Sequence, residues 1–461
     1  MYLQKFTYYF LNNEEKEFIK TSRVYKTKTN SISLVQCPQD IEYLKVFEKI
    51  INNSDNNFQG ILPNYTYCKF WQFILFFPFK IKQLHHYLQQ RKWNNLFSKL
   101  GILKFYKSNE LNFINKLKCF KQALIFYFKI KDKRFLLNHV YDKIKCGDLI
   151  YDSFLRFNNV PTINLKNPTL LLYIYDCYCQ IFYFKSLVAK NKFISYYTTY
   201  SSYISHGIPV RVFLNANIKV YSIILKNDND YTVKELSVSD NLHTKSHWNY
   251  KSNFQKLNHS ELRKLGYEKF AKRFIGNNDL SYMKVNPFKK SNLNSEALKN
   301  IDGVIFLHDF VDSPHGFRNM VFEDFYEWTI ATLNYLKQSN YKVAIKPHPN
   351  QKDASSKFVS RLKLNYPDFL WISEDTSNIL IFNSGIKFGI SVYGTVLAEL
   401  AFHKITPICC GDNPASSYDF IFEAKNADEY FKFIENHNNL KFNENLKDQL
   451  GEYYYMNYMH N

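Results

Sequence analysis

The sequence predicts an α/β protein of two domains, the second of which is Rossmann-like. Its 461 residues exceed what one hydrophobic core normally serves, so two domains are expected. Between residues 302 and 414, short apolar runs alternate with amphipathic stretches, which indicates a parallel sheet built by right-handed crossovers. Apolar residues make up 46% of the chain and long blocks of like charge are missing, so the chain is expected to be globular.

The expected elements follow one another in a regular order. In the C-terminal half, strands are expected within 302–310, 342–349, 369–373, 387–395 and 406–414. Helices are expected within 322–338, 352–366, 377–384 and 395–404. In the N-terminal half, a strand and a helix are expected at 31–37 and 40–53, and a strand, a helix and a strand within 192–223.

The chain is strongly basic between residues 61 and 145. This window holds 17 Lys and Arg against 3 Asp and Glu, in a chain of net charge +19. The stretch 79–160 lacks proline and is expected to be largely helical. Within it, residues 111–131 place aromatic and aliphatic side chains at three- and four-residue steps with lysines between them, the pattern of a helix that binds a membrane interface. A solvated helix with an aromatic core face is the alternative.

Several classes of protein are not expected. No RNA-recognition, zinc-finger or helix-turn-helix motif accompanies the basic charge, so nucleic acid is not an expected partner. The N-terminus lacks the apolar core of a signal peptide, and the apolar run 70–79 is about half a bilayer span. The eight cysteines lack CxxC spacing, which indicates buried thiols in a reducing cytoplasm.

Residues 340–351, NYKVAIKPHPNQ, end a predicted buried strand with a histidine between two prolines. Pro347 and Pro349 stop the strand and hold His348 stiffly just past its end. Open α/β sheets bind ligands at this edge, and Lys346 adds a second cationic group there. A rigid loop whose histidine only satisfies a neighbour is the alternative interpretation.

A second loop at the same edge follows the strand within 387–395. Gly394 permits close backbone approach, and Thr395 can cap the next helix, whose free N–H groups would attract a phosphate. Glu399, one turn later, is placed to accept hydrogen bonds from a ribose. Ordinary strand-to-helix turns also contain such residues, but next to a cationic loop they indicate a site for a nucleotide.

The segments KPHP and SVYGTVLAELAFHKITPICCGDNP resemble the donor-binding half of bacterial capsule and lipopolysaccharide glycosyltransferases of the GT-B fold. That group includes the polysialyltransferases and the Kdo transferases of capsule assembly. In it, an HP motif and a Ser/Thr-bearing turn hold the nucleotide phosphates. The resemblance implies that His348, Pro349, Ser391, Gly394 and Thr395 bind the donor. Lys346, Tyr393 and Glu399, in the same two loops and the helix that follows, are expected to bind it as well. The second serine of the family's usual pair is absent, which leaves the donor nucleotide open.

The resemblance covers the C-terminal half well and the N-terminal half poorly. It implies two Rossmann-like domains that face each other across a cleft. Residues 1–290 would form the acceptor-side domain, with a basic helical insertion at about 61–145. Residues 291–445 would bind the nucleotide sugar, and a helix at 446–461 would return to the first domain. The polar stretch 284–300 is the expected linker.

Residues 147–156, GDLIYDSFLR, are similar to a segment of surface-carbohydrate biosynthesis proteins. Sugar transfer needs a general base for the acceptor hydroxyl and positive charge for the leaving phosphate, so no metal is required if lysine and histidine supply that charge. Asp152 is the expected base, with Asp148 and Asp312 as rivals. His348 is expected to act on the leaving group together with Lys346.

The remaining candidates lie on the acceptor side or at the hinge. Arg156 would meet an acidic acceptor sugar, although an ordinary ion pair with Asp152 on one helix face is the alternative. Four residues here carry metal-ligating side chains but form no complete ligand set: His308, Asp309, Asp312 and His315. A hinge loop hydrogen-bonded across the cleft is therefore expected rather than a metal site.

Two classes of function remain open. The first is a bacterial glycosyltransferase, peripheral on the inner face of the inner membrane, that uses a nucleotide sugar as co-substrate and no further cofactor. It would extend a capsular polysaccharide or lipopolysaccharide glycan on a glycan or lipid-linked acceptor, and transfer of a nucleotide-activated polyol phosphate is a near variant. The second is a non-catalytic GT-B-like scaffold of the capsule assembly complex.

Overall fold

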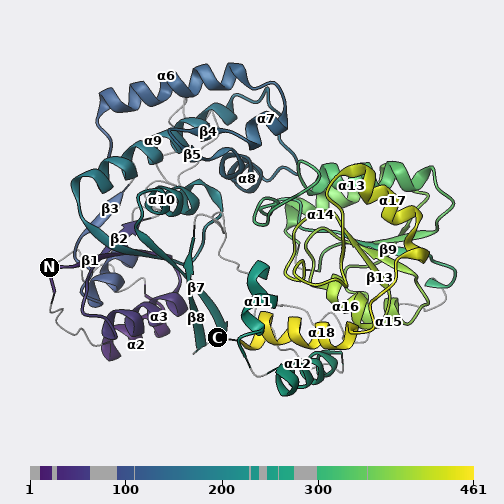
Figure 1. Ribbon diagram of the computed structural model, residues 1–461. Helices are drawn as coiled ribbons and strands as arrows, with labels where there is room; N and C mark the ends of the chain where they lie inside the picture. The colour runs from purple at the N-terminus through teal and green to yellow at the C-terminus, as the bar shows by residue number, and fades with distance from the viewer. Residues whose placement is uncertain are drawn as a thin grey trace. The chain divides into compact units, whose positions relative to one another are not determined.

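The computed structural model describes residues 11–22, 29–62, 91–107, 110–227, 230–237, 247–257, 259–274, 298–349 and 351–460 (Figure 1). The chain forms two compact units. The first comprises Met1–Asn158 and Asn164–Thr244, and the second Asn159–Ile163 and Lys245–Asn461. The division after Thr244 lies earlier in the chain than the boundary expected at residue 290. The expected linker falls largely in 275–297, outside the described residues.

The first unit contains a six-stranded sheet of order β3-β2-β1-β6-β7-β8. Counted along the chain, this is the 3-2-1-4-5-6 order of the Rossmann fold. Neighbouring strands are parallel except for β7 and β8, which are antiparallel. The strands are β1 (Ile32–Gln36), β2 (Asn57–Leu62), β3 (Phe105–Lys107), β6 (Phe193–Thr198), β7 (Lys219–Asn227) and β8 (Asp230–Leu236).

Helices and one short hairpin complete the described part of the first unit. The helices are α2 (Asn13–Thr21), α3 (Ile41–Asn52), α6 (Phe113–Lys129), α7 (Lys133–Leu137), α8 (Gly147–Asn158), α9 (Thr169–Lys190) and α10 (Tyr203–Asn215). Residues 91–99 are helical as well. The hairpin pairs β4 (Val140–Tyr141) with β5 (Ile144–Lys145) and was not predicted. The predicted helical character of 79–160 is confirmed for most of its described residues.

The second unit contains another six-stranded sheet, of order β11-β10-β9-β12-β13-β14, again the 3-2-1-4-5-6 arrangement. All its strand pairs are parallel. Its four central strands are buried along their whole length, as parallel strands covered by helices on both faces must be. The strands are β9 (Gly303–Phe306), β10 (Val343–Lys346), β11 (Leu370–Trp371), β12 (Phe388–Ile390), β13 (Thr406–Cys409) and β14 (Phe422–Glu423).

The helices of the second unit alternate with these strands, as the sequence predicts. They are α11 (Tyr250–Phe254), α12 (His259–Arg273), α13 (Phe325–Lys337), α14 (Asp353–Asn365), α15 (Asn378–Phe382), α16 (Val396–Phe402), α17 (Ala427–Glu435) and α18 (Leu446–Tyr454). Asp324 caps α13 by accepting the N–H groups of Tyr326 and Glu327 at 3.0 and 2.8 Å. The segment Asn159–Ile163 belongs to this unit although it precedes the rest of the unit in the sequence. Its Thr162 hydroxyl donates to Asp324 at 2.6 Å.

The predicted fold class is therefore confirmed. Both units carry a Rossmann-type sheet, and two Rossmann-like domains are the composition of the GT-B fold. Each sheet has its topological switch point between its two central strands, β1 and β6 in the first unit and β9 and β12 in the second.

Two further observations concern membrane-spanning helices and the state of the cysteines. In the described ranges, no helix combines the length and apolar character needed to cross a membrane. The cysteines among these residues are buried and unpaired: Cys37, Cys119, Cys146, Cys177, Cys179, Cys409 and Cys410. The apolar run 70–79 lies outside the described residues.

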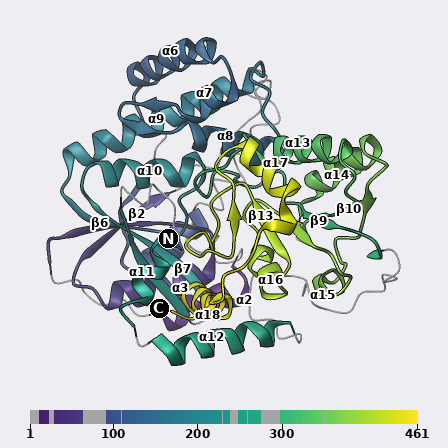
Figure 2. The same ribbon diagram turned by 45° about the vertical axis from the view of Figure 1, so that its right-hand side comes forward.

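The last helix, α18, packs against α12 within the second unit (Figures 1 and 2). A glycine from each helix lies at the crossing. A Cβ on Gly266 would lie 2.1 Å from the carbonyl oxygen of Gly451, and a Cβ on Gly451 would lie 2.2 Å from that of Arg263. The two backbones therefore touch, which only glycine allows. The predicted return of this helix to a first domain of residues 1–290 stays a prediction; its partner α12 lies within those residues, and both helices belong to the second unit.

Replacing Gly451 with alanine is expected to lower the free energy of unfolding by about 1–3 kcal/mol, because the added methyl forces the two helices apart. Urea denaturation of the purified variant measures this. Asp448→Ala, an exposed substitution on the same helix, is the control and should stay within about 0.5 kcal/mol of the natural protein. Equal stability of all three proteins would mean that the glycine contact is not needed.

Candidate active site

His308 lies at the switch point of the second sheet, directly after β9. Its Nε2 atom accepts the backbone N–H groups of Val392 and Tyr393 at 3.2 and 3.1 Å and lies 3.2 Å from the Ser391 hydroxyl. Its ring stacks on Phe325 at a centroid distance of 4.4 Å. The histidine thus joins the loops that follow the two central strands, and it engages two N–H groups of the turn that precedes α16 (Val396–Phe402).

The environment of His308 favours the neutral imidazole. Burial lowers the pKa of His308 to about 3, and the charge of the nearby His348 acts in the same direction. A neutral ring is also what the geometry needs, because Nε2 must be unprotonated to accept two N–H groups.

The free energy of unfolding should consequently fall in acid. Between the ordinary histidine value of 6.5 and about 3, the unfolded chain takes up a proton at His308 that the folded protein excludes, so stability is lost as the pH falls. The loss is up to about 1.4 kcal/mol per pH unit in that window. Urea denaturation from pH 7 to pH 4 should show a flatter profile for His308→Gln than for the natural protein. Parallel profiles would contradict this assignment.

The turn after β12 is held from several sides. The Ser391 hydroxyl donates to the carbonyl of Phe306 at 3.2 Å, and the Tyr393 hydroxyl donates to the carbonyl of Pro314. A Cβ on Gly394 would lie 2.9 Å from the Ser391 Oγ, so glycine is needed for this close turn. Thr395 has helical backbone angles and makes no side-chain capping bond, unlike its predicted role. Gly394 and Thr395 are the partly exposed residues of the turn.

Lys346 and Glu399 belong to one buried polar network. The Lys346 ammonium donates to the carbonyl of Thr376 at 2.6 Å and to the side-chain oxygen of Asn378 at 2.5 Å. Asn378 in turn donates to Glu399 at 3.2 Å, and the other carboxylate oxygen of Glu399 lies 3.4 Å from a guanidinium nitrogen of Arg273. All four charged or amide side chains of this network are buried.

The network bears on the donor-binding roles that the sequence predicts for Lys346 and Glu399. Burial lowers the pKa of Lys346 to about 8, although the carboxylates of Glu399 and Asp375 act against the shift. Both oxygens of Glu399 are engaged within the protein, whereas the sequence predicted that they would accept hydrogen bonds from a ribose. The predicted contacts of Lys346 and Glu399 with a donor therefore stay predictions.

The loops after β9 and β10 bring histidine and carboxylate groups together. His348 is partly exposed between the two prolines, and burial lowers its pKa while the charges of Asp309 and Asp312 act to raise it. Asp309 accepts the N–H of Lys352 at 3.3 Å and the hydroxyl of Ser355, which ties its loop to the start of α14. Asp312 is exposed.

Two further predicted residues of these loops, Pro349 and His315, are half-buried. Among the described residues, no group of three or more histidine, cysteine or acidic side chains is arranged to hold a metal ion. The side chains of the loop from His308 to His315 are instead distributed over separate contacts, with His308 bonded to the turn after β12 and Asp309 to the start of α14.

A buried carboxylate after β13 was missed by the sequence analysis. Asp412 bonds to His247 at 2.9 Å and to the indole N–H of Trp248, and it lies 3.5 Å from Arg318. Burial alone raises the pKa of Asp412, but His247, Trp248 and Arg318 together hold it below its usual value. The Arg318 guanidinium stacks 3.4 Å from the Trp248 ring centre. These partners lie far from Asp412 in the sequence, so no pattern near Asp412 indicates that they meet.

In the first unit, the predicted base Asp152 lies buried on α8, and Arg156 on the same helix has its guanidinium 5.9 Å from the Tyr203 ring centre. The rival Asp148 makes a two-pronged ion pair with the buried Arg211, with both N–O distances 2.6 Å. Both carboxylate oxygens of Asp148 are thus engaged within the protein, and its role as a rival base stays a prediction.

The switch point of the first sheet holds a histidine that the sequence analysis did not single out. Gln36, at the end of β1, lies 2.6 Å from the His206 Nδ1 and accepts the Thr199 hydroxyl at 2.8 Å. Burial lowers the pKa of His206 to about 4, so the ring is neutral at pH 7. Beside it, Tyr203 has a positive φ of 63°, a strained conformation for a residue with a side chain. The sequence feature that could have indicated this group of residues is the polar stretch TTYSS, directly after a predicted strand.

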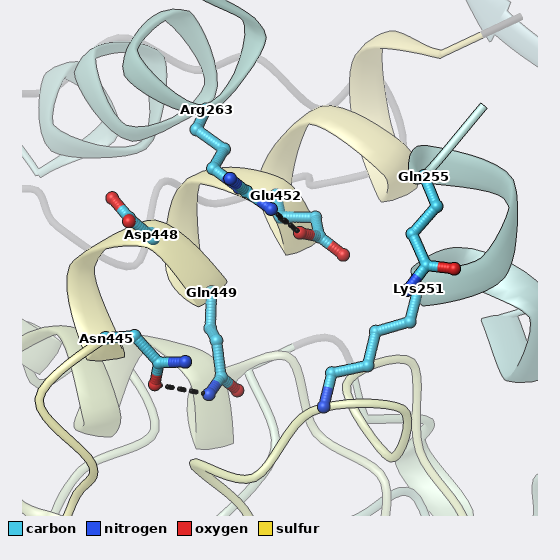
Figure 3. A pocket seen from close by; sticks show the side chains of 7 residues that line it. All are labelled: Lys251, Gln255, Arg263, Asn445, Asp448, Gln449 and Glu452. Atoms are coloured by element: carbon cyan, nitrogen blue, oxygen red, sulfur yellow. Dashed lines mark hydrogen bonds and ion pairs between the residues drawn. The ribbon is translucent and has the colours of Figure 1, made fainter. Parts of the chain in front are cut away.

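A surface hollow of about 230 Å³ lies elsewhere in the second unit, between α11, α12 and α18 (Figure 3). Its two cations are already paired, Arg263 with Glu452 at 3.2 Å and Lys251 with Asp419 at 3.2 Å. None of the residues that line the hollow is a predicted site residue, so it is not the candidate active site.

Comparison with known proteins gives a distant likeness only. The chain matches no protein-family model and no curated protein. It is similar to the solved structure of Thermosulfurimonas dismutans KpsC, beta Kdo 2,4 transferase, with a TM-score of 0.35 and 12% identity over 54% of this chain and 75% of that chain. It is also similar to Methanocaldococcus jannaschii UDP-GlcNAc 2-epimerase, with a TM-score of 0.32 and 10% identity over 92% and 97%. Likenesses this distant assign no activity to the chain.

Proposed function

We propose that the protein is a glycosyltransferase that moves a sugar from a nucleotide donor to a capsular polysaccharide or lipopolysaccharide glycan. The observation that carries the proposal is the group of residues at the switch point of the second sheet. There, His308, His348 and the partly exposed turn at Gly394 and Thr395 lie at the edge where Rossmann-type sheets bind nucleotides. The sequence resemblance to the capsule and lipopolysaccharide transferases supports the same class of reaction.

The donor phosphates would lie beside His348 and the turn after β12. A bound phosphate favours the protonated form of His348, so its pKa should rise when the donor binds and the ring can then donate to the leaving group. Thr395, whose side chain makes no capping bond, is available to the same phosphate.

The acceptor hydroxyl needs a base, and the first unit offers two. Asp152 on α8 is the group that the sequence predicts. His206 is a second choice, because its ring is neutral at pH 7 and can take up a proton. A pH–rate profile of Asp152→Asn and His206→Gln would separate the two, since loss of the base removes the corresponding limb of the profile.

A non-catalytic scaffold is the second candidate, and one observation favours it. Lys346 and Glu399, which a nucleotide-binding site would use, are both bonded within the protein. A scaffold that has kept the fold without the reaction would show the same pairing.

Nucleotide binding distinguishes the candidates. A thermal-shift series with CMP, CDP, UDP, GDP, their sugars and CDP-glycerol should find one ligand that stabilises the protein by about 2.7 kcal/mol at 100 times its dissociation constant. A response to CDP-glycerol alone would favour polyol-phosphate transfer. The variant Thr395→Glu, which places a carboxylate at the phosphate position, should abolish the shift, whereas Ser360→Glu on the exposed face of α14 should not. The scaffold candidate is favoured if no nucleotide stabilises the natural protein.

A further inference from the structure

The helix α6 has two apolar faces, which is unusual for a helix at the surface of a globular unit. Its inner face is formed by the buried side chains Cys119, Ala123 and Phe126, and the helix packs on α9 of the same unit (Figures 1 and 2). Its outer face carries five large apolar side chains that are exposed: Phe113, Ile114, Leu117, Ile125 and Phe128. Phe120, at the border of the two faces, packs against Tyr175 of α9 at a ring-centroid distance of 5.7 Å.

The exposure of this outer face is large. Phe128 is 77% exposed and Phe113 is 73% exposed. At 100° per residue, Leu117, Phe128 and Phe113 lie within one narrow sector, opposite the buried residues. Large apolar side chains gathered in one exposed sector mark an interaction site, and the exposed Lys121 lies among them.

The charge around the outer face identifies the partner. The helix contains no acidic residue, and Lys118, Lys121 and Lys129 are exposed beside the apolar side chains. A second copy of the chain would bring like charges together on this face. A dissolved anionic polymer would engage the lysines but would leave the aromatic and aliphatic groups in water. An anionic lipid surface satisfies both, because its headgroups attract lysine and its acyl boundary takes apolar side chains.

We propose that the outer face of α6 docks the protein on an anionic lipid bilayer. The helix of 17 residues is about 25 Å long, shorter than the hydrocarbon core of a bilayer, and its lysines would not enter that core. It therefore lies in the plane of the interface, with Leu117 and Phe128 below the headgroups and the lysines among them. This docking is independent of the proposed transferase activity.

Sedimentation with phosphatidylcholine vesicles, with and without phosphatidylglycerol, tests the proposal on the full chain. The natural protein should bind the anionic vesicles. Lys118→Gln, Lys121→Gln and Lys129→Gln together should weaken binding on the order of a hundredfold, since each cation near an anionic surface contributes about fivefold. The control is the same change at three exposed lysines of α12, Lys264, Lys269 and Lys272, which alters the net charge equally and should leave binding unchanged.

The apolar contribution has its own variant and control. Leu117→Ser with Phe128→Ser should weaken binding by about tenfold or more, whereas Leu364→Ser, at an 80% exposed leucine of α14, should not. Because all these side chains are exposed, the variants should keep the melting temperature of the natural protein.

Four results would overturn the proposal. Failure of the natural protein to bind anionic vesicles would exclude a lipid surface. Equal loss with the α6 and α12 lysine variants would mean that only net charge matters. Unchanged binding of the double serine variant would assign the face to an anionic polymer, and a change in its oligomeric state by sedimentation velocity would assign it to a second copy. Nucleotide thermal shifts, measured without vesicles, report on the transferase separately.

Discussion

His348→Ala is expected to lower the turnover of sugar transfer about a hundredfold, the typical loss of one positioned donor to a developing negative charge. The side chain is partly exposed at the end of β10 and lies near Asp309 and Asp312, whose charges favour its protonated form. Nucleotide affinity should fall as well. In the natural protein, that affinity should rise as the pH is lowered, because His348 takes up a proton that the bound phosphate stabilises.

The control for this prediction is His259→Ala, a half-buried histidine on α12 of the same unit. It should keep both turnover and the pH dependence of nucleotide binding. Initial rates with a nucleotide sugar and isothermal titration calorimetry between pH 5.5 and pH 8 provide the two measurements. A folded His348→Ala protein with the natural turnover and the natural pH dependence would remove this residue from the site.

Arg273→Met is expected to lower the free energy of unfolding by about 3–5 kcal/mol, because it leaves the buried Glu399 carboxylate without its cation. Arg273 also donates to the Tyr458 hydroxyl at 3.3 Å, so it connects α12, α16 and the C-terminal segment. Chemical denaturation followed by circular dichroism measures the loss.

Two comparisons give this result its meaning. Arg263→Met, on the same helix, removes a half-exposed ion pair with Glu452 and should cost at most about 1 kcal/mol. Adding Glu399→Gln to Arg273→Met should recover part of the loss, since the amide can be buried at lower cost than an unpaired carboxylate. If Arg273→Met and Arg263→Met destabilise equally, burial of the Arg273 pair is not what matters.

The fold was predictable because its determinants are local. The buried runs before His308, Lys346 and Ser391 read directly as strands, and the amphipathic stretches between them read as helices. The carboxyl ends of parallel strands meet at one edge, so the sequence also placed His348 and the turn after β12 together. His308 was expected in a hinge loop instead, and its bonds to this turn were not predicted. The hairpin β4–β5 was missed because strands of two residues leave almost no pattern.

The pairing of the site residues was not predictable, because it depends on partners far away in sequence. Nothing near Glu399 indicates Arg273, and nothing near Lys346 indicates Asn378. The expectation for Thr395 failed for a different reason: its backbone is already helical, and a capping side chain needs the extended geometry of the preceding position. Charged residues at a strand end thus identified the edge but not which side chains are free for a ligand.

The bond between Thr162 and Asp324 has a consequence for how the protein is made. The two residues are 162 positions apart, and Thr162 belongs to the second unit although most of the first unit's β6 to β8 follows it. At about 5–20 residues per second, Asp324 is synthesised roughly 8 to 30 seconds after Thr162. During translation, the short segment Asn159–Ile163 is therefore synthesised before the residues of the second unit that it contacts. Ile163, which is buried in the folded protein, is exposed to solvent for that time. The time at which this segment can dock during translation is set by the arrival of α13, not by the end of the first unit.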